Sequence, residues 1–291
     1  MDELELAKNF ERERPQLRAV AYRILGSVSE ADDAVQEAWL RLRRTDAEQI
    51  DRLDRWLTTV VARICLNVLR ARRTRGEQPL DGFLPEPIID DPASGTDPEH
   101  EALLADAVGI ALQVVLDTLR PAERLAFVLH DMFAVPFDEI AAMVNRSPQA
   151  TRQLASRARR RVREAAPLPD PDLTRQRTVV DAYFVAAREG DLEALVAVLD
   201  PNVVLRAHRR DGDPLELHGA TRVAEGAMGA RRFAPYVRPA LVNGAAGAIA
   251  FDGERPFAVL AFTVVGDRAV AIDVFNDPEL VGKLDIRGIA G

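Results

Sequence analysis

Residues 137–163 read FDEIAAMVNRSPQATRQLASRARRRVR. The first eight have helical apolar spacing, and Asn145 suits a helix C-cap because asparagine tolerates the left-handed backbone. Ser147 as N-cap and Pro148 in the first turn begin a second helix. Two short helices joined by a tight turn predict a helix-turn-helix. Any short helical hairpin can mimic this pattern. The role of the segment is therefore inferred from the side chains on the two faces of the second helix.

The second helix has an apolar stripe and a polar face. Leu154, Ala155, Ala158 and Val162 fall at helical spacing and are expected to face the core. The polar face is expected to contact a DNA groove and its phosphates through Gln149, Thr151, Arg152, Ser156, Arg157 and Arg160. A helix fits the major groove, where arginine can bond guanine bidentately and glutamine suits adenine. The C-terminal arginines are better suited to phosphates, which position a protein without specifying sequence.

A second arginine run lies upstream. Residues 63–75 read RICLNVLRARRTR, with five arginines and no acidic residue, in a chain whose formal net charge is -8. Positive charge segregated on a helical segment is the electrostatic footprint of a polyanion-binding protein. The alternative is a solvated, salt-bridged helix face. Two such segments predict two separate contacts with nucleic acid.

Residues 1–75 are predicted to be all-helical. An apolar stripe from Leu17 to Leu25 ends at Gly26, and Ser29 can cap the next helix. That helix carries on one face Asp33, Gln36, Glu37, Leu40 and Arg41. Acidic groups beside an exposed apolar anchor suit a basic protein partner. The alternative is an ordinary solvated helix face.

Residues 76–107 have the composition of a linker. They contain nine acidic residues, five prolines and no lysine or arginine, which favours an extended tether over a packed domain. One apolar knot interrupts them, and a purely solvated tether does not need it: Phe83, Leu84, Pro85, Glu86 and Pro87. We expect this knot to dock on another part of the protein.

After a second proline-rich linker at 165–172, the pattern changes from helices to strands. Two helices are expected from about residue 175 to 199. Strand-like segments follow at 203–207, 240–242, 248–251, 257–265 and 270–275. Helices followed by an antiparallel meander predict an α+β domain whose sheet bends around one face.

Composition excludes several classes of protein. The single cysteine, Cys65, rules out an internal disulfide framework and a cysteine-based zinc site. No apolar run approaches the roughly 18–20 residues that span a bilayer, and the acidic N-terminus lacks the pattern of a signal peptide. We therefore expect a cytoplasmic protein with no membrane partner, no metal and no cofactor.

Residues 10–165 resemble an extracytoplasmic-function (ECF) sigma factor of bacterial RNA polymerase. The segments YRILGS at 22–27 and DDAVQEAWLRL at 32–42 are similar to that family's core-binding region 2, and RWLTTVVAR at 55–63 to its promoter −10 helix. The segment LRPAER at 119–124 and the helix-turn-helix resemble region 4. The C-terminal part resembles a SnoaL-like (NTF2-like) cone, and its segment IDVFNDPEL at 272–280 is typical of sigma factors with that extension.

The resemblance implies a multidomain fold: region 2 at 1–75, the linker at 76–107, region 4 at 108–165 and the SnoaL-like domain at 174–291. The face from Asp33 to Arg41 would bind the RNA polymerase core, through its beta-prime and beta subunits. Region 4 would read duplex promoter DNA at −35 with the six residues named above. Opened DNA at −10 would meet Trp56, Arg63, Asn67, Arg70 and Arg73, and the polar 45–51 loop would accept an extruded base. A core role remains the alternative for Trp56.

Two signatures of this group are present in altered form. The linker of the group usually reads Trp-Leu-Pro-Glu-Pro, whereas here Phe83 stands before residues 84–87. The tail domain usually has an Asn-Gly-x-Pro-Gly turn, whereas here the turn reads Asn243-Gly244-Ala245-Ala246-Gly247. The resemblance implies a regulatory contact between this linker and Asn243, Gly244 and Gly247. With a regulatory domain on the same chain, no dedicated anti-sigma factor should be required.

The C-terminal domain leaves alternatives open. Cones of this kind hold apolar ligands or catalyse proton transfers, and the acid–base candidates here are His208, His218, Asp252 and Asp273. No paired spacing compels catalysis, and fold analogy does not transfer function. A regulatory module is the preferred interpretation, with a small apolar ligand as a candidate partner and an enzyme as the alternative. An ordinary duplex-binding regulator is the other alternative, although it assigns no role to the Asp33–Leu40 face.

Overall fold

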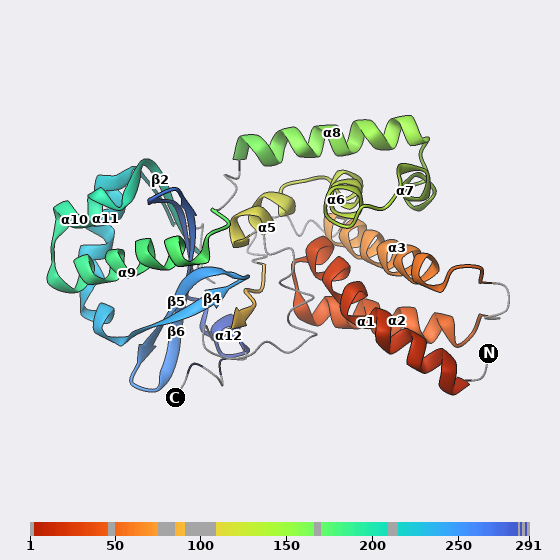
Figure 1. Cartoon of the computed structure of the whole chain (residues 1–291), viewed down its shortest axis with the longest axis horizontal. Coiled ribbons are helices and arrows are strands. Elements are labelled where there is room, and N and C mark those ends of the chain that lie inside the picture. Colours follow the sequence, from red (N-terminus) through yellow and green to blue (C-terminus); the bar gives the residue numbers. More distant parts are fainter. Residues whose placement is uncertain are drawn as a thin grey trace. The chain divides into compact units, whose positions relative to one another are not determined.

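The protein is described by a computed structural model for residues 3–45, 50–74, 85–90, 109–165, 170–208, 215–284, 286 and 289. It divides into two compact units (Figure 1). The first unit comprises Met1–Pro79, Thr96–Asp106 and Gln113–Ala165. The second comprises Leu80–Gly95, Ala107–Leu112 and Ala166–Gly291.

Three helices form the N-terminal part of the first unit: α1 (Glu3–Leu25), α2 (Val28–Leu42) and α3 (Leu53–Thr74). Their apolar stripes meet in a core that fully buries Tyr22, Leu25, Leu42, Leu57 and Leu66. The cap of α2 is Ser27, whose side chain accepts a 3.3 Å hydrogen bond from the Glu30 amide. The prediction that Ser29 is the cap is wrong, because the helix already begins at Val28.

The rest of the first unit is also helical. It contains α5 (Gly109–Asp117) from Gln113 onward, α6 (Pro121–Phe127), a π-helical turn η2 (Val128–Met132), α7 (Phe137–Val144) and α8 (Pro148–Ala165). The helix-turn-helix is confirmed at α7 and α8. Asn145 ends α7 in left-handed backbone (φ 56, ψ 57), and the Ser147 hydroxyl accepts a 3.2 Å bond from the Ala150 amide. The first residues of α5, including Ile110, pack in the core of the second unit.

The two helical parts of the first unit are packed against each other. The side chain of Arg124 is buried, pairs with Asp117, and donates to the carbonyl of Arg23 at 3.3 Å. Arg55 pairs with Glu139 at 2.8 Å across α3 and α7. These contacts explain why residues from both parts form one compact unit.

The second unit is α+β, as expected. Its helices are α9 (Leu173–Glu189), α10 (Leu192–Ala197), α11 (Ala220–Gly229), the 3-10 helix η3 (Arg231–Tyr236) and α12 (Pro278–Val281). Its strands are β1 (Ile89–Asp90), β2 (Leu199–His208), β3 (Leu215–His218), β4 (Val237–Val242), β5 (Ala245–Asp252), β6 (Arg255–Val265) and β7 (Arg268–Phe275). They form one sheet in the order β1-β4-β5-β6-β7-β2-β3.

The meander expected from the sequence is only partly right. Strands β4 to β7 pair antiparallel in chain order. β2 instead runs parallel to β7, with Leu205 opposite Ile272, because the chain leaves β2 and crosses to the far side of the sheet before β4 begins. The short edge strand β3 and the helix α11 were not foreseen, and β1 comes from the segment predicted to be a linker.

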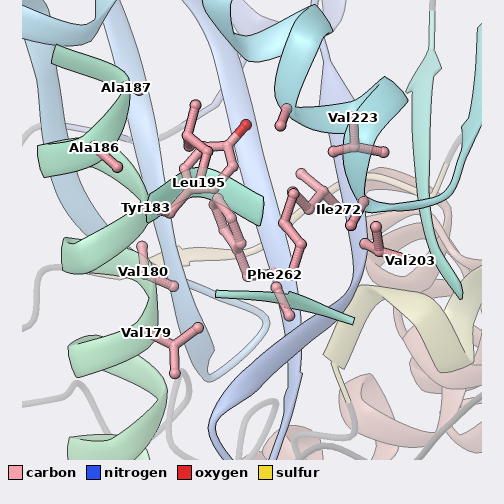
Figure 2. Close-up of a cluster of buried hydrophobic side chains, with 14 of the residues drawn as sticks. Val179, Val180, Tyr183, Ala186, Ala187, Leu195, Val203, Val223, Phe262 and Ile272 are labelled. Carbon is pink, nitrogen blue, oxygen red and sulfur yellow. The ribbon is translucent and has the colours of Figure 1, made fainter. Parts of the chain in front are cut away.

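Both faces of the sheet are apolar. Figure 2 shows Val179, Val180 and Tyr183 of α9 pointing toward Phe262 and Ile272 of the sheet. The rings of Tyr183 and Phe262 lie 5.2 Å apart and edge-on. On the opposite face, a second cluster is formed by Ile89, Ile110, Val242, Ile249, Phe251, Val259, Phe275 and Ile289. The linker strand β1 is therefore part of the core of this unit.

Candidate DNA and polymerase interfaces

The exposed face of α8 carries most of the side chains predicted to read duplex DNA. Those left exposed are Gln149, Arg152, Ser156, Arg157 and Arg160. Thr151 is fully buried, and its hydroxyl donates to the carbonyl of Ser147 at 3.0 Å. The prediction that Thr151 faces a DNA groove is therefore wrong. Thr151 lies on the same helical stripe as the buried Ala155, Ala158 and Val162.

The arginines of α8 differ in how they are held. Glu123 is almost fully buried and accepts from Arg157 at 3.0 Å and from Arg161 at 3.2 Å. Arg159 pairs with Asp131. Among the residues that the structure describes, no ion pair is recorded for Arg160 or Arg163. The last two turns of α8 thus combine anchored guanidinium groups with others that are available to phosphates.

Helix α3 presents the predicted −10 face to solvent. Arg63, Asn67, Arg70 and Arg73 are exposed, and the first three share one face at helical spacing. Arg63 also donates to the carbonyl of Ala142 at 3.3 Å. Two members of the arginine run do not join this face: Arg72 is buried against Leu25 and Glu30, and Arg75 lies outside the described residues.

Trp56 is half-buried, so part of its ring packs in the helical core and part is exposed. It lines an open groove of about 360 Å³ together with Arg55, Thr59, Val60, Arg63 and Glu139. A ring in this position can contribute to packing and still offer an edge or face to a base. Within the 45–51 loop, which was predicted to accept an extruded base, residues 46–49 lie outside the described part of the chain.

The predicted polymerase face lies along α2. Asp33 and Gln36 are exposed, and Leu40 is 37% exposed, which is unusual for a large apolar side chain in a well-packed helix. Glu37 and Arg41 form an exposed i,i+4 pair at 2.9 Å, so their charges largely cancel. The rest of this face consists of the apolar side chain of Leu40 with Asp33 and Gln36.

Comparison with known proteins decides what these faces belong to. Residues 10–75 match the family described as Sigma-70 region 2, and residues 110–162 match Sigma-70, region 4. The ECF RNA polymerase sigma factor SigJ of Mycobacterium tuberculosis is 38% identical, over 94% of this chain and 93% of SigJ. The chain belongs to the ECF sigma factor family.

Two further relatives agree with this assignment. A protein of Mycobacterium tuberculosis described as a probable ECF RNA polymerase sigma factor, SigI, is 33% identical, over 93% of each chain. The crystal structure of Mycobacterium tuberculosis SigJ superposes with a TM-score of 0.78 at 34% identity, covering 96% of this chain and 99% of the other. The resemblance therefore extends through the α+β unit as well as the two sigma regions.

In this sigma factor, part of the predicted linker knot is built into the second unit. Pro85 and Pro87 are buried, and β1 pairs antiparallel with β4, with Ile89 opposite Val242. Asn243 then holds Ile88 at two points: its Oδ1 atom accepts from the Ile88 amide at 2.9 Å, and its own amide donates to the Ile88 carbonyl at 2.8 Å. We call this pair of hydrogen bonds the linker clasp. Phe83 and Leu84 lie outside the described residues.

The turn that carries the linker clasp has a demanding backbone. Asn243 and Gly244 both have positive φ, 51 and 73, as in a two-residue hairpin of type I′, for which Asn-Gly is a favoured pair. Asn243 is only 1% exposed. At Gly247 an added Cβ would lie 2.6 Å from the Leu260 carbonyl oxygen. The residues predicted for the regulatory contact thus either hold the linker or shape the strand beside it.

The described acid–base candidates of the sigma factor's α+β unit lie in different surroundings. Asp273 is fully buried and accepts from Arg206 at 2.8 and 3.2 Å across β2 and β7. His218 is exposed and lies 3.3 Å from Glu216, and Asp252 is exposed in the β5–β6 hairpin. The side chain of His208 is outside the described set. Among the described residues, no recorded hydrogen bond joins two of these candidates.

Sequence reasoning missed several residues that shape the interfaces of the sigma factor. Glu123 organises two arginines of α8, and Phe137 lies beneath a third, with the Arg152 Cζ atom 5.6 Å from the ring centroid. Composition gave no signal for Glu123, because its partners are more than 30 positions away in the chain. Over the described residues, no group of three or more potential metal ligands is found, and no helix is long and apolar enough to cross a membrane.

Proposed function

We propose that this ECF sigma factor directs the RNA polymerase core to promoters by three surfaces. The α2 face around Asp33, Gln36 and Leu40 binds the beta-prime and beta subunits. The α3 face binds opened DNA at −10, and the exposed face of α8 reads duplex DNA at −35. The observation that carries the proposal is the presence of two exposed arginine faces on separate helices, one in each of the two matched sigma regions.

The chemistry of each face suits its assigned DNA. The α3 face has arginines and Asn67 spaced along one side, which suits a single-stranded backbone and its unpaired bases. The α8 face has Gln149 and Arg152 in its first turns, where helix-turn-helix proteins contact base edges. Arg160 and Arg163 near its end suit phosphates. A cytoplasmic location, where polymerase and promoter DNA meet, is part of this proposal.

The second unit is proposed to regulate these contacts through the linker. The segment Pro85–Asp90 is bound by the linker clasp and by β4, so it is not a free tether while it is docked. Docking restricts the conformations open to the linker between the −10 helix and region 4. Release of the segment from β4 would restore that freedom.

We propose that the second unit is a regulatory module and not an enzyme. The apolar face between its sheet and helices is filled by contacting aromatic rings, with Tyr183 and Phe184 5.3 Å apart and Phe184 and Phe262 5.8 Å apart. The only carboxylate among the candidates that is fully buried, Asp273, is neutralised by Arg206. These features support regulation by protein contacts without a small apolar ligand.

Reconstituted transcription tests the proposal. Purified core polymerase is combined with the wild-type chain, with Asn243→Gly, which removes the side-chain half of the linker clasp, or with Asn202→Gly, an exposed control in β2. Promoter-specific transcripts are expected with all three proteins, and their yield should differ several-fold only for Asn243→Gly. Failure of the wild-type chain to bind core polymerase would refute the sigma role, whereas equal yields from all three proteins would refute regulation through the clasp.

A further inference from the structure

Three side chains contact one another near the first turns of α8. The ring of His130 stacks on that of Phe137, with centroids 3.7 Å apart and planes 29° from parallel. The guanidinium carbon of Arg152 lies 5.6 Å from the centroid of the same Phe137 ring. The three residues come from η2, from the first position of α7 and from the second turn of α8. Sequence analysis singled out Arg152 alone among them.

The backbone between His130 and Phe137 fixes the positions of these two rings. His130 lies in the π-helical turn, and its Nδ1 atom is 3.1 Å from the carbonyl oxygen of Val135. Between them Ala134 adopts φ 53, in the left-handed region that residues with a side chain rarely enter. The Val135 amide closes the turn by donating to the Leu129 carbonyl at 2.8 Å. Such a constrained turn holds the His130 and Phe137 rings in place before any ligand binds.

The N–H donors of Arg152 are available to a ligand. Among the described residues no hydrogen bond or ion pair is recorded for its side chain, and its contact with the Phe137 ring is a cation–π contact. By contrast, Arg157 and Arg161 donate hydrogen bonds to Glu123, and Arg159 donates one to Asp131. Arg152 is therefore oriented by a contact that does not consume its donors. It is exposed, and it follows Gln149 by one helical turn on the same face.

We propose that Phe137 is a positioning residue that holds Arg152 for reading one guanine of the −35 element, and that His130, which stacks on the Phe137 ring, supports it. Arg152 then donates two hydrogen bonds to the O6 and N7 atoms of that guanine. The ring reduces the number of orientations that Arg152 must give up on binding, since the side chain is already ordered in the free protein. This inference rests on the proposed −35 role of α8 and adds to it the origin of base preference at one position.

The test uses holoenzyme reconstituted from core polymerase and the full chain, with promoter DNA in which each base pair of the −35 element is replaced in turn. Arg152→Ala should lower the preference for guanine at one position by about 5- to 150-fold, the range for losing a bidentate contact. Phe137→Leu should lower preference at the same position by about two- to fivefold, the range for an exposed cation–π contact. Phe137→Tyr keeps the ring and should keep the preference.

Controls separate positioning from folding. Phe133→Leu changes a nearby phenylalanine of the same turn and should leave base preference unaltered. A purely structural role for Phe137 would weaken binding to all sequences equally, and that result would overturn the inference while leaving the −35 role intact. If Phe137→Leu does not fold, His130→Gln removes the supporting ring while keeping a donor for Val135, and unchanged base preference in that variant would overturn the inference. Wild-type holoenzyme without any −35 preference would instead refute the proposed function itself.

Discussion

Replacing Asn243 with glycine removes one half of the linker clasp and leaves the backbone of the turn in place. The Ile88 amide, 2.9 Å from Asn243 Oδ1, then loses its acceptor in a place where Ile88 is only 5% exposed. Leaving a buried donor unsatisfied costs about 1–3 kcal/mol. Glycine tolerates positive φ at no steric cost, so this variant removes the side-chain contacts of Asn243 without straining the turn. Asn243→Ala should cost roughly 1–2 kcal/mol more, because alanine is strained at φ 51.

Hydrogen exchange of the Ile88 amide in the full-length protein measures this cost directly. Protection should fall by about 5- to 150-fold in Asn243→Gly, following from the 1–3 kcal/mol above, and further in Asn243→Ala. Amides in the centre of β6 should be unchanged if only the linker is released. The matched control Asn202→Gly, an exposed asparagine of the same unit, should retain wild-type protection at Ile88. Equal protection of Ile88 in the wild type and Asn243→Gly, or an unprotected Ile88 in the wild type, would refute this reasoning.

Three other predictions follow from the interfaces and the core. Leu40→Ala should weaken binding to core polymerase by about tenfold or more, as for a central apolar anchor, and should change the free energy of unfolding by no more than about 0.5 kcal/mol. Glu11→Ala on α1 is the control. Equal affinity of Leu40→Ala and the wild type for core polymerase would exclude Leu40 from the interface. Arg160→Ala should reduce the slope of log affinity against log salt for −35 duplex DNA by about 0.9, and Arg157→Ala by less, because Glu123 already holds Arg157; the reverse order would contradict this. Burial raises the pKa of the Cys65 thiol, so the neutral form should persist at pH 8–9 and alkylation should be slow until the protein unfolds, whereas rapid labelling of folded protein would contradict the burial.

Local signals predicted the helical parts well, and where they failed the reason is specific. Asn145, Ser147 and Pro148 gave the helix-turn-helix because caps act over a few residues. Thr151 is polar, but it precedes the buried Ala155 by one turn, and this spacing puts it on the buried side of the helix. Arg72 belongs to the arginine run but not to its exposed face: it follows Cys65 and Leu69 on a buried stripe, and its charge is satisfied by Glu30 and the Leu25 carbonyl.

Contacts between distant segments could be anticipated only in outline. The apolar knot in an acidic linker indicated docking, but nothing local to residues 85–90 indicates that Asn243, some 155 positions away, provides the partner. The parallel pairing of β2 with β7 depends on a crossover that alternation along each strand does not encode. The stack of His130, Phe137 and Arg152 combines a strained turn with three separate elements, and single-residue patterns do not reveal it.

Transcription of fragmented genomic DNA by the reconstituted holoenzyme, with sequencing of the transcript starts, tests the sigma role most directly. We predict starts at discrete sites preceded by two sequence elements at a fixed separation, with Arg152→Ala relaxing only the upstream element. The doubly changed Asp33→Arg, Leu40→Ala chain should produce none of these starts while still binding duplex DNA. A wild-type chain that binds specific duplex sites but adds no new transcript starts to core polymerase would contradict the account and favour a duplex-binding regulator.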